Sequence, residues 1–228
     1  CQRGEPRPGA IPERGVVEVK SPKDETWLTA DTNQVSTYAA HYDTVLVTNY
    51  RAFLLIGQDA ANRPAMLESF ILADSDASFW ALTAAPRKSA KGTALAEYLK
   101  RVLTHGVALR EPKDVAWFLA SYGRDALARV EKRADGPALI ALKTSLEDSL
   151  GLRFETDTGL HFFHSTLVQT LFYGVFSAWV LWMREQRQPG RFDWRLAAWY
   201  LHVPMLKALF HQLADPEKLK SLDLVEVL

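Results

Sequence analysis

Cysteine is almost absent from this chain of 228 residues: the only one is Cys1, so no intramolecular disulfide can form. Such sparse cysteine is typical of proteins in reducing compartments, and we therefore expect a cytoplasmic protein. Residues 1–14 are polar and rich in proline and glycine, which does not match a signal peptide. Because residue 1 is Cys rather than Met, we expect the chain to begin inside a longer protein.

An excess of charge is also missing, since 27 Lys and Arg balance 27 Asp and Glu. This balance argues against a uniformly basic nucleic-acid coat protein but not against local basic patches. Hydrophobic residues make up 48% of the chain and charged residues 24%, which excludes a disordered chain, a collagen-like fibre and a disulfide scaffold. We find no internal repeat and no Gly-x-Ser-x-Gly motif of a serine hydrolase.

The first third of the chain has the pattern of a small sheet with one helix. Short β-branched and apolar runs predict strands at 16–20, 44–48, 52–57 and 67–73. The run at 44–48 is nearly continuous, which is typical of a strand buried on both faces. Between the first two runs, helix-forming residues predict a helix over 29–42.

Beyond about residue 75 only helical patterns occur, and 84–92 has the composition of a linker. Strands followed by helices indicate an α+β fold, with a sheet domain at 1–80 and an all-α helical bundle at 90–228. The expected helices are 93–105, 112–134, 137–150, 159–187, 195–213 and 216–226, three of which begin near Pro112, Pro137 and Pro216.

One segment, 159–183, contains no Asp, Glu, Lys or Arg and is long enough to span a bilayer. It does contain His161, His164 and Gln169, and charged residues follow it directly. A helix that is apolar all round is also what the centre of a bundle needs. We favour a buried core helix over a membrane-attached module, and we expect no membrane partner.

Glu18 and Lys20 alternate along the first predicted strand, which places both side chains on one face of it. Val17 and Val19 are expected to point the other way, into the core. A carboxylate and an ammonium on an otherwise apolar strand are costly unless they have a role. The pair suits metal-assisted hydrolysis of a phosphodiester: Glu18 can bind a divalent cation, and Lys20 can orient or help to deprotonate the attacking water. A surface strand with a simple ion pair is the alternative.

Gln34 and Tyr38 lie four residues apart in the predicted helix that follows, and hence on one helical face. From that face both polar groups can reach the edge of the strand that carries Glu18 and Lys20. There they can contact a phosphate or a metal-bound water, so we expect them to support the same site.

The order of these segments resembles the PD-(D/E)xK nuclease fold. The segments are GVVEVKSPKDE (15–25), QVSTYAAHYDTVLVTNYRAFLLIG (34–57) and LESFILA (67–73). They look like the nuclease-like N-terminal region of large adenine-specific DNA methyltransferases of restriction-modification systems. Gln34-x-x-x-Tyr38 is similar to the QxxxY motif of one branch of that fold. The helical segments 97–131, 159–185 and 213–228 resemble the spacer that joins nuclease and methyltransferase in these fused proteins.

This resemblance implies Mg²⁺-dependent hydrolysis of double-stranded DNA. Glu18 would be the metal ligand, Lys20 would position or activate water, and Gln34 and Tyr38 would support them. The resemblance also implies a covalently continuous methyltransferase domain that uses S-adenosylmethionine. The chain itself lacks the Gly-rich loop and the Asn-Pro-Pro-Tyr or Asp-Pro-Pro-Tyr motif of that activity.

The chain departs from the family in one respect. The family has an acidic residue, usually Asp after Pro, on the strand that precedes the Glu-x-Lys strand, where it supplies the second metal carboxylate. Here the only acidic residues before Glu18 are Glu5 and Glu13, in sequence with the composition of a loop. We expect the Asp to have been lost with a truncated N-terminus; a catalytically inactive DNA-binding or coupling module of a DNA methyltransferase is the alternative.

A local excess of basic residues occurs within 84–133, where 11 basic residues accompany 5 acidic ones. This stretch can face DNA phosphates, and a solvated helical surface is the alternative. The candidate DNA-binding residues are Lys88, Lys91, Lys100, Arg101, Arg110 and Lys113.

The histidines and the aromatic residues of 159–183 are two further candidates for binding, but for both we favour a role in core packing. His161 and His164 have the i, i+3 spacing of a metal site on one helix face, but no third ligand accompanies them, and neutral core histidines are preferred. The aromatic residues of this segment can stack on bases, but their helical spacing favours core packing.

Overall fold

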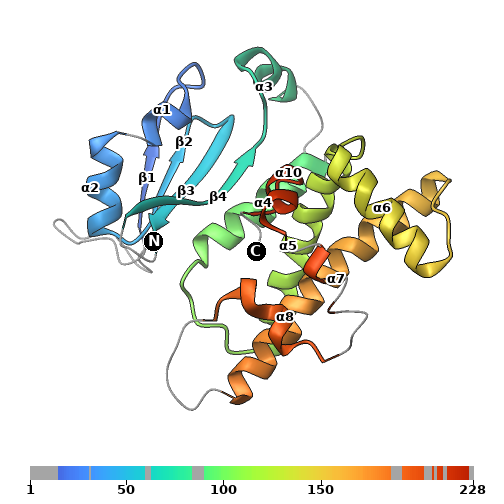
Figure 1. The fold of residues 1–228 in the computed structure, drawn as a ribbon. Coiled ribbons are helices and arrows are strands. Elements are labelled where there is room, and N and C mark those ends of the chain that lie inside the picture. Colours follow the sequence, from blue (N-terminus) through green and yellow to red (C-terminus); the bar gives the residue numbers. More distant parts are fainter. Residues whose placement is uncertain are drawn as a thin grey trace. The chain divides into compact units, whose positions relative to one another are not determined.

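The computed structural model describes residues 15–30, 32–59, 63–83, 90–185, 192–202, 207, 210–212 and 215–225. They form two compact units, Cys1–Leu109 and Arg110–Leu228, each with its own hydrophobic core (Figure 1). The first unit combines a four-stranded sheet with helices, and the described part of the second is helical. The chain therefore has the mixed α+β character that the order of its segments predicts.

The sheet of the first unit has the strand order β1-β2-β3-β4 (Figure 1). β1 runs parallel to β2, whereas β3 pairs antiparallel with both β2 and β4. The strands are β1 (Val16–Val19), β2 (Val45–Thr48), β3 (Ala52–Gln58) and β4 (Pro64–Ile71). All four overlap predicted strands; β4 begins earlier than expected because its pairing with β3 extends to Pro64.

Two short helices connect β1 to β2, because parallel neighbours need a crossover connection. They are α1 (Thr26–Ala30) and α2 (Asn33–His41). Thr32 caps α2: its side-chain oxygen accepts a hydrogen bond from the backbone N–H of Val35 at 3.4 Å. The single helix predicted over 29–42 is therefore two helices, and α2 is the one that carries Gln34 and Tyr38.

The core of this unit lies between α2 and one face of the sheet. Its buried residues are Val35, Ala39, Val45, Val47, Leu54 and Ile56, with Val16, Ala30 and Tyr38 packed against them. Because side chains alternate along a strand, Val16 shares its face with Glu18 and Lys20. The prediction that Val17 and Val19 point into the core is wrong: they are 57% and 45% exposed. The reason is that β1 is the edge strand of the described sheet. At β1, α2 covers the face that carries Val16 and Glu18, and not the face that carries Val17 and Val19.

The opposite face of the sheet is covered at β3 and β4 by α4 (Ala90–Leu103). The Tyr98 hydroxyl donates a hydrogen bond to the carbonyl oxygen of Phe53 at 3.2 Å. One turn further on, the Arg101 guanidinium forms an ion pair with the Glu68 carboxylate at 2.9 Å, and both residues are buried. These contacts attach α4 to the sheet.

The boundary between the two units therefore lies later in the chain than the linker-like composition of 84–92 suggests. The helix α3 (Asp76–Thr83) precedes this segment, and residues 84–89 lie outside the described residues. The order of segments predicts a helical bundle from residue 90 onward, whereas α4 belongs to the sheet unit. Composition does not reveal this, because the contacts of α4 are with residues far away in sequence.

The described part of the second unit is built from helices. They are α5 (Pro112–Lys132), α6 (Pro137–Leu150), α7 (Asp157–Glu185), the 3₁₀ helix η1 (Trp194–Leu196), α8 (Ala197–Tyr200) and α10 (Pro216–Ser221). Three of them, α5, α6 and α10, begin at the prolines that the sequence points to. Proline is tolerated at the first helical position because its missing N–H has no intrahelical partner there. The helix predicted over 195–213 is interrupted after Tyr200, since Leu201 is extended with ψ 114°; later in that range, the described residues 207 and 210–212 are helical again.

α7 is the only described helix that is long and apolar enough to cross a membrane, and 28% of its apolar window is buried in the unit. Length and composition alone are weak evidence for a membrane span. Phe163, Leu167 and Leu171 of α7 belong to the hydrophobic core, as the sequence predicts, but Phe162 and Tyr173 are largely exposed. α7 is therefore a core helix on one side only, rather than a helix buried all round.

Candidate active site

Glu18 and Lys20 lie on one face of β1, as their spacing predicts, and they form an ion pair there; the face is the one that α2 covers. The Lys20 ammonium lies 2.8 Å from a Glu18 carboxylate oxygen, and the two side chains are 36% and 16% exposed, respectively. The backbone N–H of Lys20 donates to the Thr48 carbonyl oxygen at 2.8 Å, which fixes the end of β1 against β2. A largely buried carboxylate thus lies at the border of an apolar core, next to a partly accessible ammonium.

The helix α2 brings a second polar pair to this border. The Gln34 side-chain amide donates a hydrogen bond to the Tyr38 hydroxyl at 2.9 Å, so the two residues share one helical face as predicted. Tyr38 packs against the hydrophobic core of this unit. Gln34 is exposed, and its hydrogen bond to Tyr38 is its link to the candidate site.

The charge of Lys20 is stabilised by its surroundings. The hydrogen bond that Lys20 donates to Glu18 and the negative charge of the same carboxylate raise the pKa of Lys20, with smaller contributions from Asp24 and Tyr38, while desolvation opposes the shift. In this arrangement Lys20 can orient a water or neutralise a phosphate, and its part in deprotonating the attacking water stays a prediction.

The described residues offer a divalent cation only part of a site. Glu18 provides a carboxylate, the type of ligand that Mg²⁺ prefers, and Mg²⁺ is often held by one or two carboxylates plus substrate phosphates. Within the described ranges, however, no three His, Cys, Asp or Glu side chains gather where they could share an ion. Glu5 and Glu13, the earlier acids in the sequence, lie outside the described residues. The fit to Mg²⁺ thus rests on a single carboxylate.

Sequence reasoning missed two buried polar residues that stand close to this site. Asn49 and Arg51 flank Tyr50 in the turn from β2 to β3, and both bind the backbone of the segment that follows Lys20. The signal was present: the carboxyl ends of parallel strands meet at one edge of a sheet, so the residues after β2 must lie near those after β1.

The residues predicted to bind DNA have different environments. Lys88 lies outside the described residues. Arg101 is buried in its ion pair with Glu68, so in this structure it does not contact a phosphate. The remaining four are exposed: Lys91, Lys100, Arg110 and Lys113. The first two belong to the sheet unit and the last two to the helical unit.

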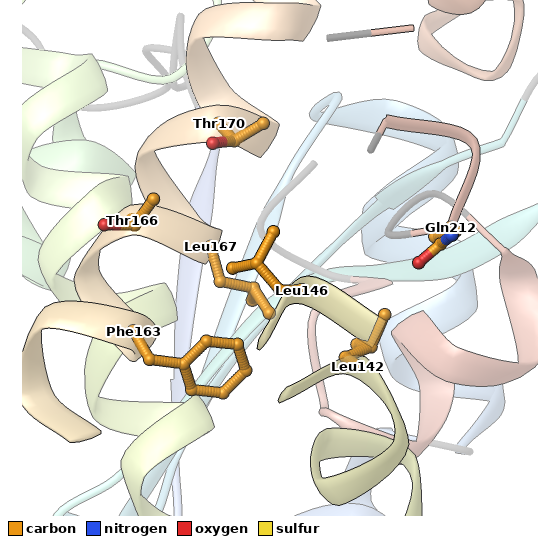
Figure 2. A pocket seen from close by; sticks show the side chains of 7 residues that line it. All are labelled: Leu142, Leu146, Phe163, Thr166, Leu167, Thr170 and Gln212. Carbon is orange, nitrogen blue, oxygen red and sulfur yellow. The ribbon is translucent and has the colours of Figure 1, made fainter. Parts of the chain in front are cut away.

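The hollows in the helical unit contain none of the candidate site residues. A cavity of about 20 Å³ lies between α6 and α7, lined by Leu142, Leu146, Phe163, Thr166, Leu167, Thr170 and Gln212 (Figure 2). That volume suits about one water, and its mainly apolar walls indicate a packing gap. Two wider grooves of about 420 Å³ each lie between α5 and α7 and between α7 and α8.

The two histidines of α7 have separate environments. His161 pairs with Glu131 at 3.0 Å on the surface, whereas His164 is buried. Desolvation lowers the pKa of His164, which favours the neutral form expected of a core histidine. They share no metal site with a third ligand among the described residues.

No protein-family model matches this chain, and searches of curated proteins and of solved structures found no significant match. The function proposed below therefore depends on the residues of the candidate active site and on the resemblance noted in the sequence.

Proposed function

We propose that the sheet unit is the nuclease-like part of a restriction-modification protein and that its reaction is Mg²⁺-dependent hydrolysis of a phosphodiester in double-stranded DNA. The observation that carries this proposal is the Glu18–Lys20 ion pair at 2.8 Å, with Glu18 only 16% exposed on the helix-covered face. A carboxylate with so little access to water loses part of its hydration, and an apolar residue of similar size would often be neutral or stabilising there. A chemical role for the pair accounts for its presence on that face.

Each residue has a distinct part in this proposal. Glu18 would hold the cation, which would supply positive charge beside the phosphate. Lys20 positions or activates the attacking water and offsets negative charge on the phosphate. Tyr38 packs against the core of the sheet unit, and Gln34 holds the Tyr38 hydroxyl through its hydrogen bond. Lys91 and Lys100, which are exposed on the same unit, are the candidate phosphate contacts that remain there.

The rest of the proposal follows the same resemblance. The helical unit would be a connector, and in the parent protein it would lead to a methyltransferase domain that modifies adenine with S-adenosylmethionine. Arg110 and Lys113 would contact DNA from this unit. The proposed protein is cytoplasmic and not attached to a membrane.

A plasmid-nicking assay tests the reaction. Supercoiled DNA is incubated with the chain and Mg²⁺, and conversion to the open circle is compared among the wild type, Lys20→Ala and Glu18→Gln. We expect either substitution to slow nicking by at least about 100-fold, which is typical for removing one group that stabilises developing charge. Lys23→Ala is the matched control, because Lys23 is an exposed lysine in the adjacent turn. Unchanged nicking by Lys20→Ala would show that the assignment is wrong.

A second candidate function is a catalytically inactive DNA-binding or coupling module. Two observations favour it: Glu18 is already engaged by Lys20, and the described residues offer the cation no cluster of three ligands. The same proteins distinguish the two functions in a gel-shift assay. DNA binding that persists in the wild type and in Glu18→Gln, without nicking in either, would favour the inactive module.

A further inference from the structure

Tyr50, in the connection from β2 to β3, has a backbone conformation that tyrosine rarely adopts. Its φ is 66°, in the left-handed region that disfavours residues with a bulky side chain. The other described non-glycine residues with positive φ are Asp43 and Asp223. Asp tolerates this region because its short polar side chain can hydrogen-bond locally, which an aromatic ring cannot do. Tyr50 is therefore strained where the two Asp residues are not.

The neighbouring residues hold Tyr50 in this conformation. The Thr48 hydroxyl accepts a hydrogen bond from the Tyr50 N–H and donates one to the Ala52 carbonyl oxygen, both at 2.9 Å. The Asn49 side-chain oxygen accepts from the N–H groups of Arg51 and Ala52, at 3.0 and 2.8 Å. Thr48, Asn49 and Arg51 are all buried. The shape of this connection is thus fixed by hydrogen bonds that are shielded from water.

The same connection is attached to the segment that follows β1. The Asn49 side-chain amide donates to the Asp24 carbonyl oxygen at 2.7 Å, and the Arg51 guanidinium donates to the Pro22 carbonyl oxygen. These two anchors lie on either side of Tyr50 in the chain. The backbone of Tyr50 therefore cannot relax out of the left-handed region without breaking buried hydrogen bonds, which is costly.

The ring of Tyr50 is not needed to build this connection. It is 50% exposed, and the described hydrophobic core of the sheet unit does not include it. Gly or Asn would adopt the same φ with less strain. Strained conformations that the surroundings enforce are typical of binding and catalytic sites. An exposed ring held in this way points to a role in binding.

Tyr50 stands at the end of the sheet where β1 and β2 finish, which is also the end of β1 that carries Lys20. In the parallel register Val19 is opposite Thr48, and the Lys20 N–H donates to the Thr48 carbonyl oxygen at 2.8 Å. Tyr50 follows Thr48 by two residues, so it extends just past the candidate active site. An aromatic ring on a rigid surface connection can stack on a nucleobase of any identity, because every base has a π-face.

We propose, on the basis of the function proposed above, that Tyr50 is a DNA contact whose ring stacks on an unpaired nucleobase beside the phosphate at Glu18 and Lys20. The fixed conformation keeps the ring exposed before DNA binds, so little conformational freedom is lost on binding. The substrate class is duplex DNA in which one base has left the stack, because the faces of a stacked base are covered by its neighbours. Tyr50 takes no part in the hydrolysis itself.

DNA binding measured by fluorescence anisotropy without Mg²⁺ tests this contact in the whole chain. Two labelled duplexes differ at one position: one contains an extra unpaired nucleotide, and in the other the same nucleotide is abasic. We expect the wild type to bind the first more tightly by about 5- to 150-fold, the range that stacking on one aromatic ring gives. Tyr50→Asn should lose this difference, because Asn suits the backbone but has no ring. Tyr50→Phe should keep it.

Thermal unfolding of the same variants separates binding from folding. Tyr50→Asn should raise the melting temperature, because Asn adopts a positive φ with less strain. Tyr50→Gly also lacks the ring and should give the same binding result. Trp80→Leu is the control: it removes another exposed aromatic ring of this unit and should leave the difference between the two duplexes unchanged.

Equal binding of the two duplexes by the wild type overturns the role of Tyr50, and so does a wild-type difference in Tyr50→Asn. A lower melting temperature of Tyr50→Asn would show that the ring stabilises the fold and would overturn it as well. Nicking that depends on Lys20, together with equal binding of the two duplexes, leaves the nuclease assignment standing and overturns only the stacking contact. No binding of either duplex overturns both.

Discussion

The ion pair between Arg101 and Glu68 allows a direct test of whether α4 belongs to the sheet. Both side chains are nearly inaccessible, at 3% and 6% exposed, and the charged atoms are 2.9 Å apart. Arg101→Met keeps an apolar stem but removes the guanidinium from the buried carboxylate. Removing one partner of a buried pair typically costs about 3–5 kcal/mol, and we expect about 3 kcal/mol of the free energy of unfolding here because methionine refills much of the space.

The assay is urea unfolding combined with hydrogen exchange read by mass spectrometry, so that the loss can be assigned to one unit. We expect faster exchange in peptides from α4 and β4 and unchanged exchange in α7. The double variant Arg101→Met/Glu68→Leu should recover most of the loss, because no buried charge is left without its partner.

Lys100→Met is the matched control, since it removes an exposed positive charge from the neighbouring position of the same helix. It should change the free energy of unfolding by less than about 0.5 kcal/mol. A loss below about 1 kcal/mol in Arg101→Met, with unchanged exchange in α4, would refute the reasoning. α4 would then not be docked on the sheet, and Arg101 would again be a candidate phosphate contact.

Two further predictions concern the helical unit. A Cβ at Gly174 would lie 2.8 Å from the Phe210 ring, whereas a Cβ at Gly123 would meet no atom within 4 Å. In thermal unfolding we therefore expect Gly174→Ala to destabilise by about 1–3 kcal/mol and Gly123→Ala to stabilise by up to about 1 kcal/mol; equal effects would contradict this packing. The backbone N–H of Phe154 is the main cause that lowers the pKa of Glu147, so its stabilisation is present above the unfolded-state pKa and is lost as the pH falls through the folded-state value. Glu147→Gln should accordingly flatten the loss of stability in acid, and an unchanged pH profile would contradict the role of this hydrogen bond.

Local geometry explains which parts of the site were predictable. Alternation along β1 places Glu18 and Lys20 on one face, and four-residue spacing in α2 brings Gln34 to the Tyr38 hydroxyl. Neither result depends on the rest of the fold. Which face of β1 points into the core does depend on the rest of the fold. The expectation that Val17 and Val19 point inward failed because β1 is an edge strand and α2 covers its other face.

For the positively charged residues, too, local sequence is not enough to predict the environment of each side chain. By composition, Arg51, Lys100 and Arg101 are equivalent, and a count of basic residues treats each as a possible phosphate contact. The structure buries Arg51 among backbone carbonyls and Arg101 against Glu68, and it leaves Lys100 exposed. Their partners are distant in sequence, so no local pattern distinguishes them.

The sequence by itself determined the four strands, the starts of the helices at proline, and the pairing of Glu18 with Lys20, because these follow from the geometry of neighbouring residues. Only the tertiary structure decided that α4 packs on the sheet, that Asn49 and Arg51 hold the segment after Lys20, and that β1 exposes one of its faces. Those features arise from the burial of groups that meet only when the chain has folded, and burial sets both the cost of a charge and the partners it must find.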